Sequence, residues 1–320
     1  MLNSRLIKSL FFAFLCICNG AFSIVCAQEV PYPLENAKRI LFLGNSITYS
    51  GDYITMFETA IHVQYPTSRP ELINLALPSE TVSGLSEPNH AEGKFPRPYL
   101  FNRLSSVLQK TKPIDIAFAC YGMNDGIYLP FDEKRFEAYQ SGMIRLRDSL
   151  EAAGVKRIVF MTPPVHDDKQ QGVNGYNLVL DRYSKWLLMQ RKLRGWEVID
   201  LHFPMRAYLE KKRAKEANFR LAEDGVHPGK EGHWLMAKRI LHYFNIAGVS
   251  TNTTLDEFLE SHSYVGQLYQ VISRRQSLMK DAWLTYTGHE RPGMTIGLPI
   301  EEALMQYEQL EEEILAIKRD

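Results

Sequence analysis

The chain has 320 residues, which is enough for one large or two modest domains. Its 45% hydrophobic and 11% aromatic content is typical of a globular protein with a substantial core. Lys plus Arg and Asp plus Glu each number 37, so the formal net charge is zero. This balance argues against nucleic acid or an anionic membrane surface as the main partner.

The first 27 residues have the pattern of a secretory signal peptide. Arg5 and Lys8 precede an apolar run over residues 10–18, and Val25 and Cys26 lead to the small residue Ala27. Cleavage after Ala27 predicts a secreted or periplasmic protein with no stable membrane insertion. The alternative is an uncleaved membrane anchor, but the apolar run is shorter than the roughly 20 residues that a membrane span needs.

The positions of the four cysteines agree with export, and they predict a mature chain without an internal disulfide. Cys16, Cys18 and Cys26 all lie in the predicted leader, which leaves Cys120 alone in the mature chain. Because Cys120 ends an apolar run over residues 114–120, we interpret it as a small buried hydrophobic residue rather than a nucleophile.

Short apolar runs alternate with longer amphipathic stretches from residue 39 to residue 244. Strands are predicted at residues 39–43, 71–75, 114–120, 157–161 and 196–201, and helices at 53–63, 100–109, 132–153, 176–193 and 230–244. This alternation predicts a parallel sheet covered by helices on both faces, with right-handed crossovers. The basic run at residues 211–215 is interpreted as a solvated helix face.

Residues 248–320 differ in character and predict a helical C-terminal extension. A helical stretch at 254–282 and a turn at 288–299 precede a final helix that begins at Ile300. An apolar stripe follows this last helix, formed by Leu304, Tyr307, Leu310, Ile314 and Ile317. We favour an appendage packed on the core over a coil that binds a partner.

Polar residues follow several predicted strands, and the carboxyl ends of parallel strands share one edge of the sheet. Ser46, Ser79 and Asn124 follow the first three strands, and Asp224 and His227 come after the fifth. Three of them have an ordinary alternative: Ser46 as a helix cap, Asn124 as a turn residue and His227 as a loop histidine. Together they match a serine hydrolase, which needs a nucleophile, a base, a group that orients the base, and oxyanion donors.

The Asp-x-x-His spacing has a physical reason. Two intervening residues allow one turn to present both side chains from the same segment. Asp224 can then accept a hydrogen bond from one imidazole nitrogen of His227, which leaves the other nitrogen facing Ser46.

These blocks resemble the SGNH (GDSL-like) hydrolase family over residues 39–244. The matching segments are Gly-Asn-Ser-Ile-Thr at 44–48, Gly-Met-Asn-Asp at 122–125 and Asp-Gly-Val-His-Pro at 224–228. The resemblance implies an α/β fold: a flavodoxin-like three-layer α/β/α sandwich with a parallel five-stranded sheet, here followed by the helical extension. The expected organisation is a signal peptide (1–27), a hydrolase domain (28–247) and the extension (248–320).

The resemblance also implies a role for each site residue. Ser46 would attack an ester carbonyl, His227 would transfer the proton, and Asp224 would orient His227. The oxyanion hole would consist of the backbone N–H groups of Ser46 and Ser79 and the side-chain amide of Asn124. Two positions depart from the family pattern, because Asn45 replaces the usual Asp of the first block and Ser79 replaces the usual Gly of the second.

The expected function is a secreted serine esterase that forms an acyl-enzyme, with O-acetyl groups on carbohydrates as the favoured substrate. Tyr49, Tyr121 and Tyr128 lie beside the blocks and could offer stacking surfaces, and Arg97 could meet a substrate carboxylate. The alternatives are a lipid esterase or lysophospholipase, and a non-catalytic carbohydrate- or phosphate-binding module. No cofactor is expected, and no cluster has metal-ligand spacing beyond the Asp–His pair. The oligomeric state is left open.

Overall fold

A computed structural model describes residues 32–168, 175–249 and 253–317. The predicted signal peptide lies outside these residues. Within the described ranges, no helix combines the length and apolar character needed to cross a membrane.

The centre of the molecule is a five-stranded sheet in which all neighbouring strands are parallel, as predicted. The strands are β1 (Arg39–Gly44), β2 (Glu71–Asn74), β3 (Ile116–Cys120), β4 (Arg157–Met161) and β5 (Glu197–Ile199), in the order β2-β1-β3-β4-β5. Every residue of β3 is buried, as a continuously apolar central strand should be. Gly44 pairs with Cys120, so the ends of β1 and β3 lie side by side at the carboxyl edge.

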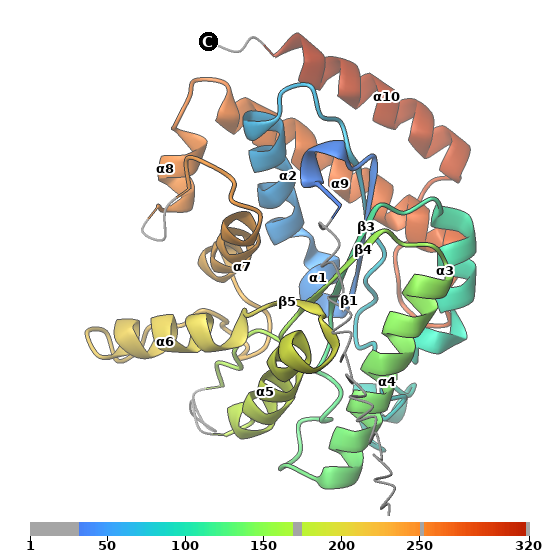
Figure 1. Cartoon of the computed structure of the whole chain (residues 1–320), viewed down its shortest axis with the longest axis vertical. Coiled ribbons are helices and arrows are strands. Elements are labelled where there is room, and N and C mark those ends of the chain that lie inside the picture. Colours follow the sequence, from blue (N-terminus) through green and yellow to red (C-terminus); the bar gives the residue numbers. More distant parts are fainter. Residues whose placement is uncertain (1–31, 169–174, 250–252, 318–320) are drawn as a thin grey trace, which may run out of the picture. The chain divides into compact units, whose positions relative to one another are not determined.

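Helices cover both faces of the sheet and give the predicted three layers (Figure 1). On one side lie α1 (Ser46–Ser50), α2 (Asp52–Gln64) and α7 (Lys230–Tyr243), and on the other α3 (Leu104–Thr111), α4 (Glu133–Ala152) and α5 (Asn177–Arg194). Phe57 of α2 packs edge-on against Phe42 and Phe118 of the sheet. Tyr139 of α4 stacks on Tyr183 of α5, with ring centroids 4.4 Å apart.

Several element boundaries differ from the prediction. The helix expected at 100–109 is a 3-10 turn (Leu100–Asn102) followed by α3, because Arg103 leaves the helical conformation between them. An additional helix, α6 (His202–Arg213), follows β5 directly and includes part of the basic run. Two further 3-10 turns lie at Leu34–Asn36 and His90–Gly93.

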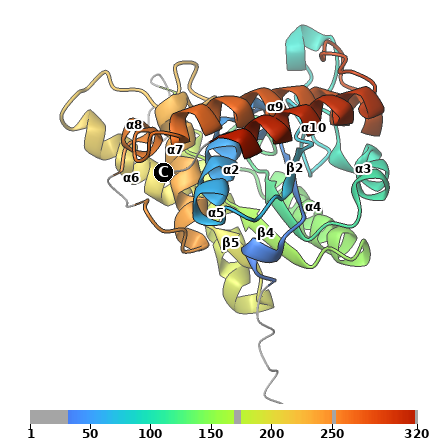
Figure 2. The same cartoon turned by 90° about the horizontal axis from the view of Figure 1, so that it is seen from above.

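The C-terminal extension packs on the α/β layers, as favoured from the sequence. It contains α8 (Leu255–Leu259), α9 (Val265–Thr287) and α10 (Ile300–Ala316), so the stretch expected at 254–282 is two helices. Arg275 and Gln276 of α9 both bind the buried carboxylate of Glu58 on α2. Figure 2 shows α10 lying along α9. The described residues between 32 and 317 form one compact unit, and a domain boundary at residue 247 stays a prediction.

Candidate active site

Ser46 lies at the carboxyl edge of the sheet, as the first residue of α1. The N-cap of this helix is Asn45, whose side-chain oxygen accepts a hydrogen bond from the Ile47 N–H at 3.1 Å. The alternative of Ser46 as the helix cap is therefore wrong, and its hydroxyl is available for other contacts. Gly44 permits the sharp turn, since a Cβ there would lie 2.5 Å from the Thr48 hydroxyl.

The loop before α7 brings His227 and Asp224 to Ser46. His227 Nε2 lies 2.7 Å from Ser46 Oγ, and His227 Nδ1 lies 2.6 Å from Asp224 Oδ2. The other Asp224 oxygen accepts the backbone N–H groups of Val226 and His227. Burial alone would raise the pKa of Asp224, but these hydrogen bonds outweigh it and lower the pKa. A charged carboxylate is thus held against the imidazole.

Two features that the sequence analysis missed hold this loop in place. Gly225 has φ of +83°, and a Cβ there would lie 3.0 Å from the Asp168 backbone. The buried Asp167 carboxylate accepts the N–H groups of Leu221 and Ala222 and pairs with Arg213. The Asp167 N–H donates to the Gly225 carbonyl at 2.7 Å. The position of Asp167 shortly after a predicted strand could have been noticed in the sequence. The residues that contact its carboxylate, however, lie 46 to 55 residues further along the chain.

The second block places Ser79 in the left-handed backbone region, with φ of +69°. Glycine adopts this region without strain, and the structure shows that serine can take the same conformation here. Among the residues that the structure describes, the Ser79 N–H has no acceptor. It is therefore free to donate to a bound oxyanion.

Asn124, in the third block, lies at the same edge. Its Nδ2 donates to the Glu80 carbonyl at 3.2 Å, and its Oδ1 accepts from the Tyr128 hydroxyl at 3.1 Å. Next to it, the fully buried Asp125 ties the second and third blocks together. One Asp125 oxygen accepts the Val82 and Ser83 N–H groups, and the other accepts that of Gly122.

Tyr121 does not lie where the sequence analysis expected it. Its side chain is fully buried, and its hydroxyl donates to Glu80 at 2.7 Å. The expected stacking surface at Tyr121 is therefore wrong, because the ring has no face exposed to a substrate. Glu80 is buried as well and forms two hydrogen bonds with Arg103, so this cluster braces the loop that carries Ser79.

Arg97 is nearly buried, and its guanidinium makes internal contacts, among them one to the Ser79 carbonyl at 3.5 Å. Its guanidinium donates to both carboxylate oxygens of Glu87 at 2.7 Å and lies over the ring of Tyr128. A substrate carboxylate would have to displace Glu87. Tyr49 is half-buried, its hydroxyl donates to Asp281, and Lys280 lies 3.7 Å from its ring centroid.

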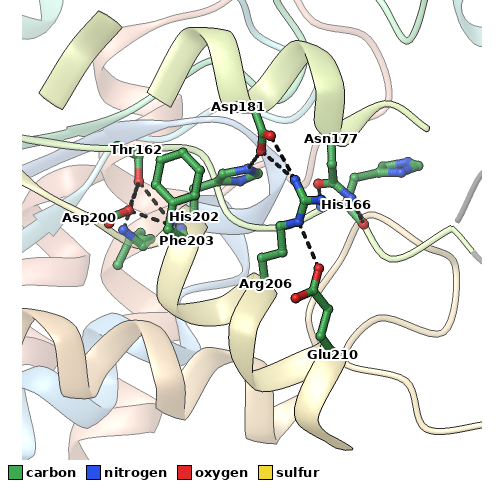
Figure 3. Close-up of polar contacts among 10 residues, drawn as sticks. Thr162, His166, Asn177, Asp181, Asp200, His202, Phe203, Arg206 and Glu210 are labelled. Atoms are coloured by element: carbon green, nitrogen blue, oxygen red, sulfur yellow. Dashed lines mark hydrogen bonds and ion pairs between the residues drawn. The ribbon is translucent and has the colours of Figure 1, made fainter. Parts of the chain in front are cut away.

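A second histidine–carboxylate cluster lies beyond the ends of β4 and β5 (Figure 3). His202 Nε2 lies 2.7 Å from Asp181, which also accepts two hydrogen bonds from Arg206. His202 is fully buried, and its other nitrogen has no partner among the described residues. Thr162 Oγ1 accepts the backbone N–H of His202, but among the described residues no hydroxyl contacts its imidazole, so we interpret this cluster as a structural link between α5 and α6.

The remaining expectations concern Cys120 and metal ions. Cys120 is buried, as predicted, and burial raises the pKa of its thiol to about 12. In residues 32–168, 175–249 and 253–317, no three His, Cys, Asp or Glu side chains are grouped to hold a metal ion.

Comparison with known proteins defines the class to which this fold and site correspond. Residues 42–235, more than half of the chain, match the GDSL-like Lipase/Acylhydrolase family. The chain belongs to this family, as its sequence blocks predicted, and is a serine ester hydrolase. A comparison with functionally curated proteins found no match.

Solved structures share the fold at low sequence identity. A gut microbial diltiazem-metabolizing enzyme is 22% identical with a TM-score of 0.54; the alignment covers 68% of this chain but only 49% of that one. A variant of an acetyl-xylooligosaccharide esterase from Geobacillus stearothermophilus is 20% identical with a TM-score of 0.51; the alignment covers 67% of this chain and 97% of the esterase. This chain therefore spans about half the length of the first and nearly all of the second.

Proposed function

We propose that Ser46, His227 and Asp224 are the catalytic triad of an exported esterase that removes O-acetyl groups from carbohydrates. The observation that carries this proposal is the unbroken hydrogen-bond chain from Asp224 through His227 to Ser46, with links of 2.6 Å and 2.7 Å. Two segments that lie 181 residues apart in the sequence converge to make it. A non-catalytic binding module would have no use for an oriented imidazole at a serine hydroxyl.

In the proposed reaction, the Ser46 oxygen attacks the acetyl carbonyl while His227 Nε2 takes the hydroxyl proton. The negative charge that develops on the carbonyl oxygen is stabilised by the N–H groups of Ser46 and Ser79 and by the Asn124 amide. Collapse breaks the ester C–O bond, and His227 returns the proton to the leaving sugar hydroxyl. Water then attacks the acetyl-serine by the same route, releasing acetic acid and restoring the Ser46 hydroxyl.

Two observations and one prediction support a bulky alcohol as the leaving group. The side chains of His227 and Asp224 are 49% and 55% exposed, so the triad lies at an open rim rather than in a closed tunnel. The predicted signal peptide would place the protein where polymeric glycans are found. A protein of the same fold is described as an acetyl-xylooligosaccharide esterase.

The first test is labelling with a fluorophosphonate probe, which reacts with activated serines. We expect the native protein to be labelled and Ser46→Ala to remain unlabelled. Labelling of another serine in the variant would contradict the assignment of the nucleophile.

The second test compares kcat/KM for O-acetylated xylotriose with that for a medium-chain 4-nitrophenyl ester and a lysophospholipid. We expect the acetylated sugar to be the best substrate. A clear preference for either of the others would replace the proposal with the lipid esterase alternative. N-terminal sequencing of protein exported by a heterologous host would test cleavage after Ala27.

A further inference from the structure

A small polar cavity lies beside the nucleophile helix, and the C-terminal extension forms one of its walls. Its volume is about 180 Å³, below the roughly 300–1,000 Å³ of pockets that enclose larger ligands, so it suits a single ring. It begins at Ser50, about 6 Å along the axis of α1 from Ser46. Its lining includes Ser50, Asp52, Asn74, Ser273, Ser277 and Lys280.

The cavity offers several polar groups that the protein itself does not use. The hydroxyls of Ser273 and Ser277 have no hydrogen bond to any residue that the structure describes. The Asp52 carboxylate is 55% exposed and lies 3.9 Å from the His233 ring, which burial keeps neutral. Unbonded hydroxyls and an exposed carboxylate together can both donate to and accept from a hydroxyl-rich ligand.

Lys280 adds a cation that is held in a defined position. Its side chain is 14% exposed, and its Nζ lies 3.7 Å from the Tyr49 ring centroid and 3.7 Å from Asp281. Because Asp52 and Asp281 offset this charge, the surroundings carry no excess of positive charge. They therefore favour an uncharged polar ligand over a phosphate or a carboxylate.

We propose that this cavity is a glycosyl subsite, which binds one uncharged sugar ring of the alcohol while Ser46 attacks an acetyl group on the neighbouring ring. This inference rests on the proposed carbohydrate esterase function and extends it. Ser273, Ser277 and Lys280 lie outside the region that matches the family, residues 42–235, so the subsite is a contribution of the extension. The extension thereby helps to select the alcohol, while the triad carries out the reaction.

The test fills the cavity without disturbing the core. Ser277 is exposed on α9, so Ser277→Tyr should fold and place a ring where the sugar ring would lie. Gln270→Tyr is the matched control, because Gln270 is exposed on the same helix and does not line the cavity. For each protein, kcat/KM is measured with O-acetylated xylotriose and with 4-nitrophenyl acetate, and the ratio of the two values is compared.

We expect the ratio to fall at least tenfold in Ser277→Tyr, mainly through KM, and to stay at the native value in Gln270→Tyr. An unchanged ratio in Ser277→Tyr would overturn the subsite and leave the carbohydrate esterase proposal intact. Lys280→Met should lower the ratio in the same direction, and it tests the cavity without adding bulk.

Failure of the carbohydrate esterase proposal itself has a different signature. The native protein would then hydrolyse 4-nitrophenyl acetate but not acetylated xylotriose. In that case, unacetylated xylotriose is titrated into the native protein and both tyrosine variants, and binding is followed by saturation-transfer NMR. Binding that is lost only in Ser277→Tyr supports the subsite, and absence of binding to the native protein overturns it.

Discussion

Two serine–histidine contacts lie on the same short helix, and they differ in what surrounds the imidazole. At the start of α1, Ser46 Oγ lies 2.7 Å from His227 Nε2. At its end, Ser50 Oγ lies 3.1 Å from His233 Nε2. The two serine–histidine contacts are similar in length, but the surroundings of the two imidazole rings differ.

His227 is half exposed and has Asp224 at its second nitrogen, so the imidazolium that forms during proton transfer is stabilised. His233 is 2% exposed on its side chain, and its Nδ1 has no partner among the described residues. Burial lowers the pKa of His233 to about 4, so this ring resists protonation. The Ser50 hydroxyl also donates to the Ile47 carbonyl and has no proton to offer. We therefore attribute the proposed general-base role of His227 to its orienting carboxylate rather than to the serine–histidine contact alone.

The sharpest test of this comparison removes each hydroxyl in turn. Ser46→Ala should lower kcat for 4-nitrophenyl acetate by about 10⁴-fold or more, because the covalent route is lost. Ser50→Ala should cost less than tenfold. Steady-state kinetics of both variants, with circular dichroism as a control for folding, would measure this. A loss of similar size in the two variants would mean that the second contact also takes part in catalysis.

The next largest loss of activity should follow replacement of Asp224, which contacts His227 Nδ1 and has no counterpart at His233 Nδ1. Asp224→Asn keeps the shape but removes the charge that stabilises the His227 imidazolium, so we expect kcat to fall by about 10³–10⁴-fold with little change in KM. Stopped-flow measurement of 4-nitrophenol release would show slower acylation. A loss of less than tenfold would indicate that the backbone alone orients His227.

A smaller effect is expected from Tyr128, which we place as a positioning residue for Asn124. Its hydroxyl donates to Asn124 Oδ1, while Asn124 Nδ2 donates to the Glu80 carbonyl, so it helps to fix the orientation of the amide that we propose as an oxyanion donor. Removing an oxyanion donor itself costs about 10²–10³-fold in rate, so Asn124→Ala sets the upper bound. We expect Tyr128→Phe to lower kcat several-fold at constant KM and to have a much smaller effect in the Asn124→Ala background. Equal losses in both backgrounds would rule out action through Asn124.

The sequence predicted the sheet and the positions of Ser46, Asn124, Asp224 and His227 because these depend on local patterns. Continuous apolar runs mark buried parallel strands, and turn residues after them mark the carboxyl edge. The convergence of the three blocks followed from the topology of a parallel sheet. Both ends of all five strands were correct within two residues.

The supporting contacts could not be predicted, because their partners are far apart in the chain. Asp125 binds backbone groups more than 40 residues earlier, and Tyr121 turns inward to Glu80. A tyrosine beside a site block has the same sequence pattern whether its ring is exposed or buried. The contact between Tyr49 and Lys280 spans α1 and the extension, and no periodicity in either segment indicates it.

The last prediction uses the depressed pKa of His233 and concerns stability rather than rate. The folded protein keeps His233 neutral down to about pH 4, whereas the unfolded chain takes up a proton near the ordinary pKa of 6.5. The unfolded state therefore binds more protons between these values, and the stability contributed above pH 6.5 is lost as the pH falls. Between pH 7.5 and pH 5 this loss is about 2 kcal/mol.

His233→Gln has no titrating ring, so its free energy of unfolding in urea should decrease by about 2 kcal/mol less than that of the native protein over the same pH range. Its kcat for 4-nitrophenyl acetate at pH 7.5 should stay within about threefold of the native value, since a ring that is already neutral supplies no charge to the reaction. An identical pH dependence of stability in the two proteins would show that His233 is protonated in the folded state. The contrast between a buried His233 that stays neutral and the half-exposed, carboxylate-bound His227 would then be wrong at its first term.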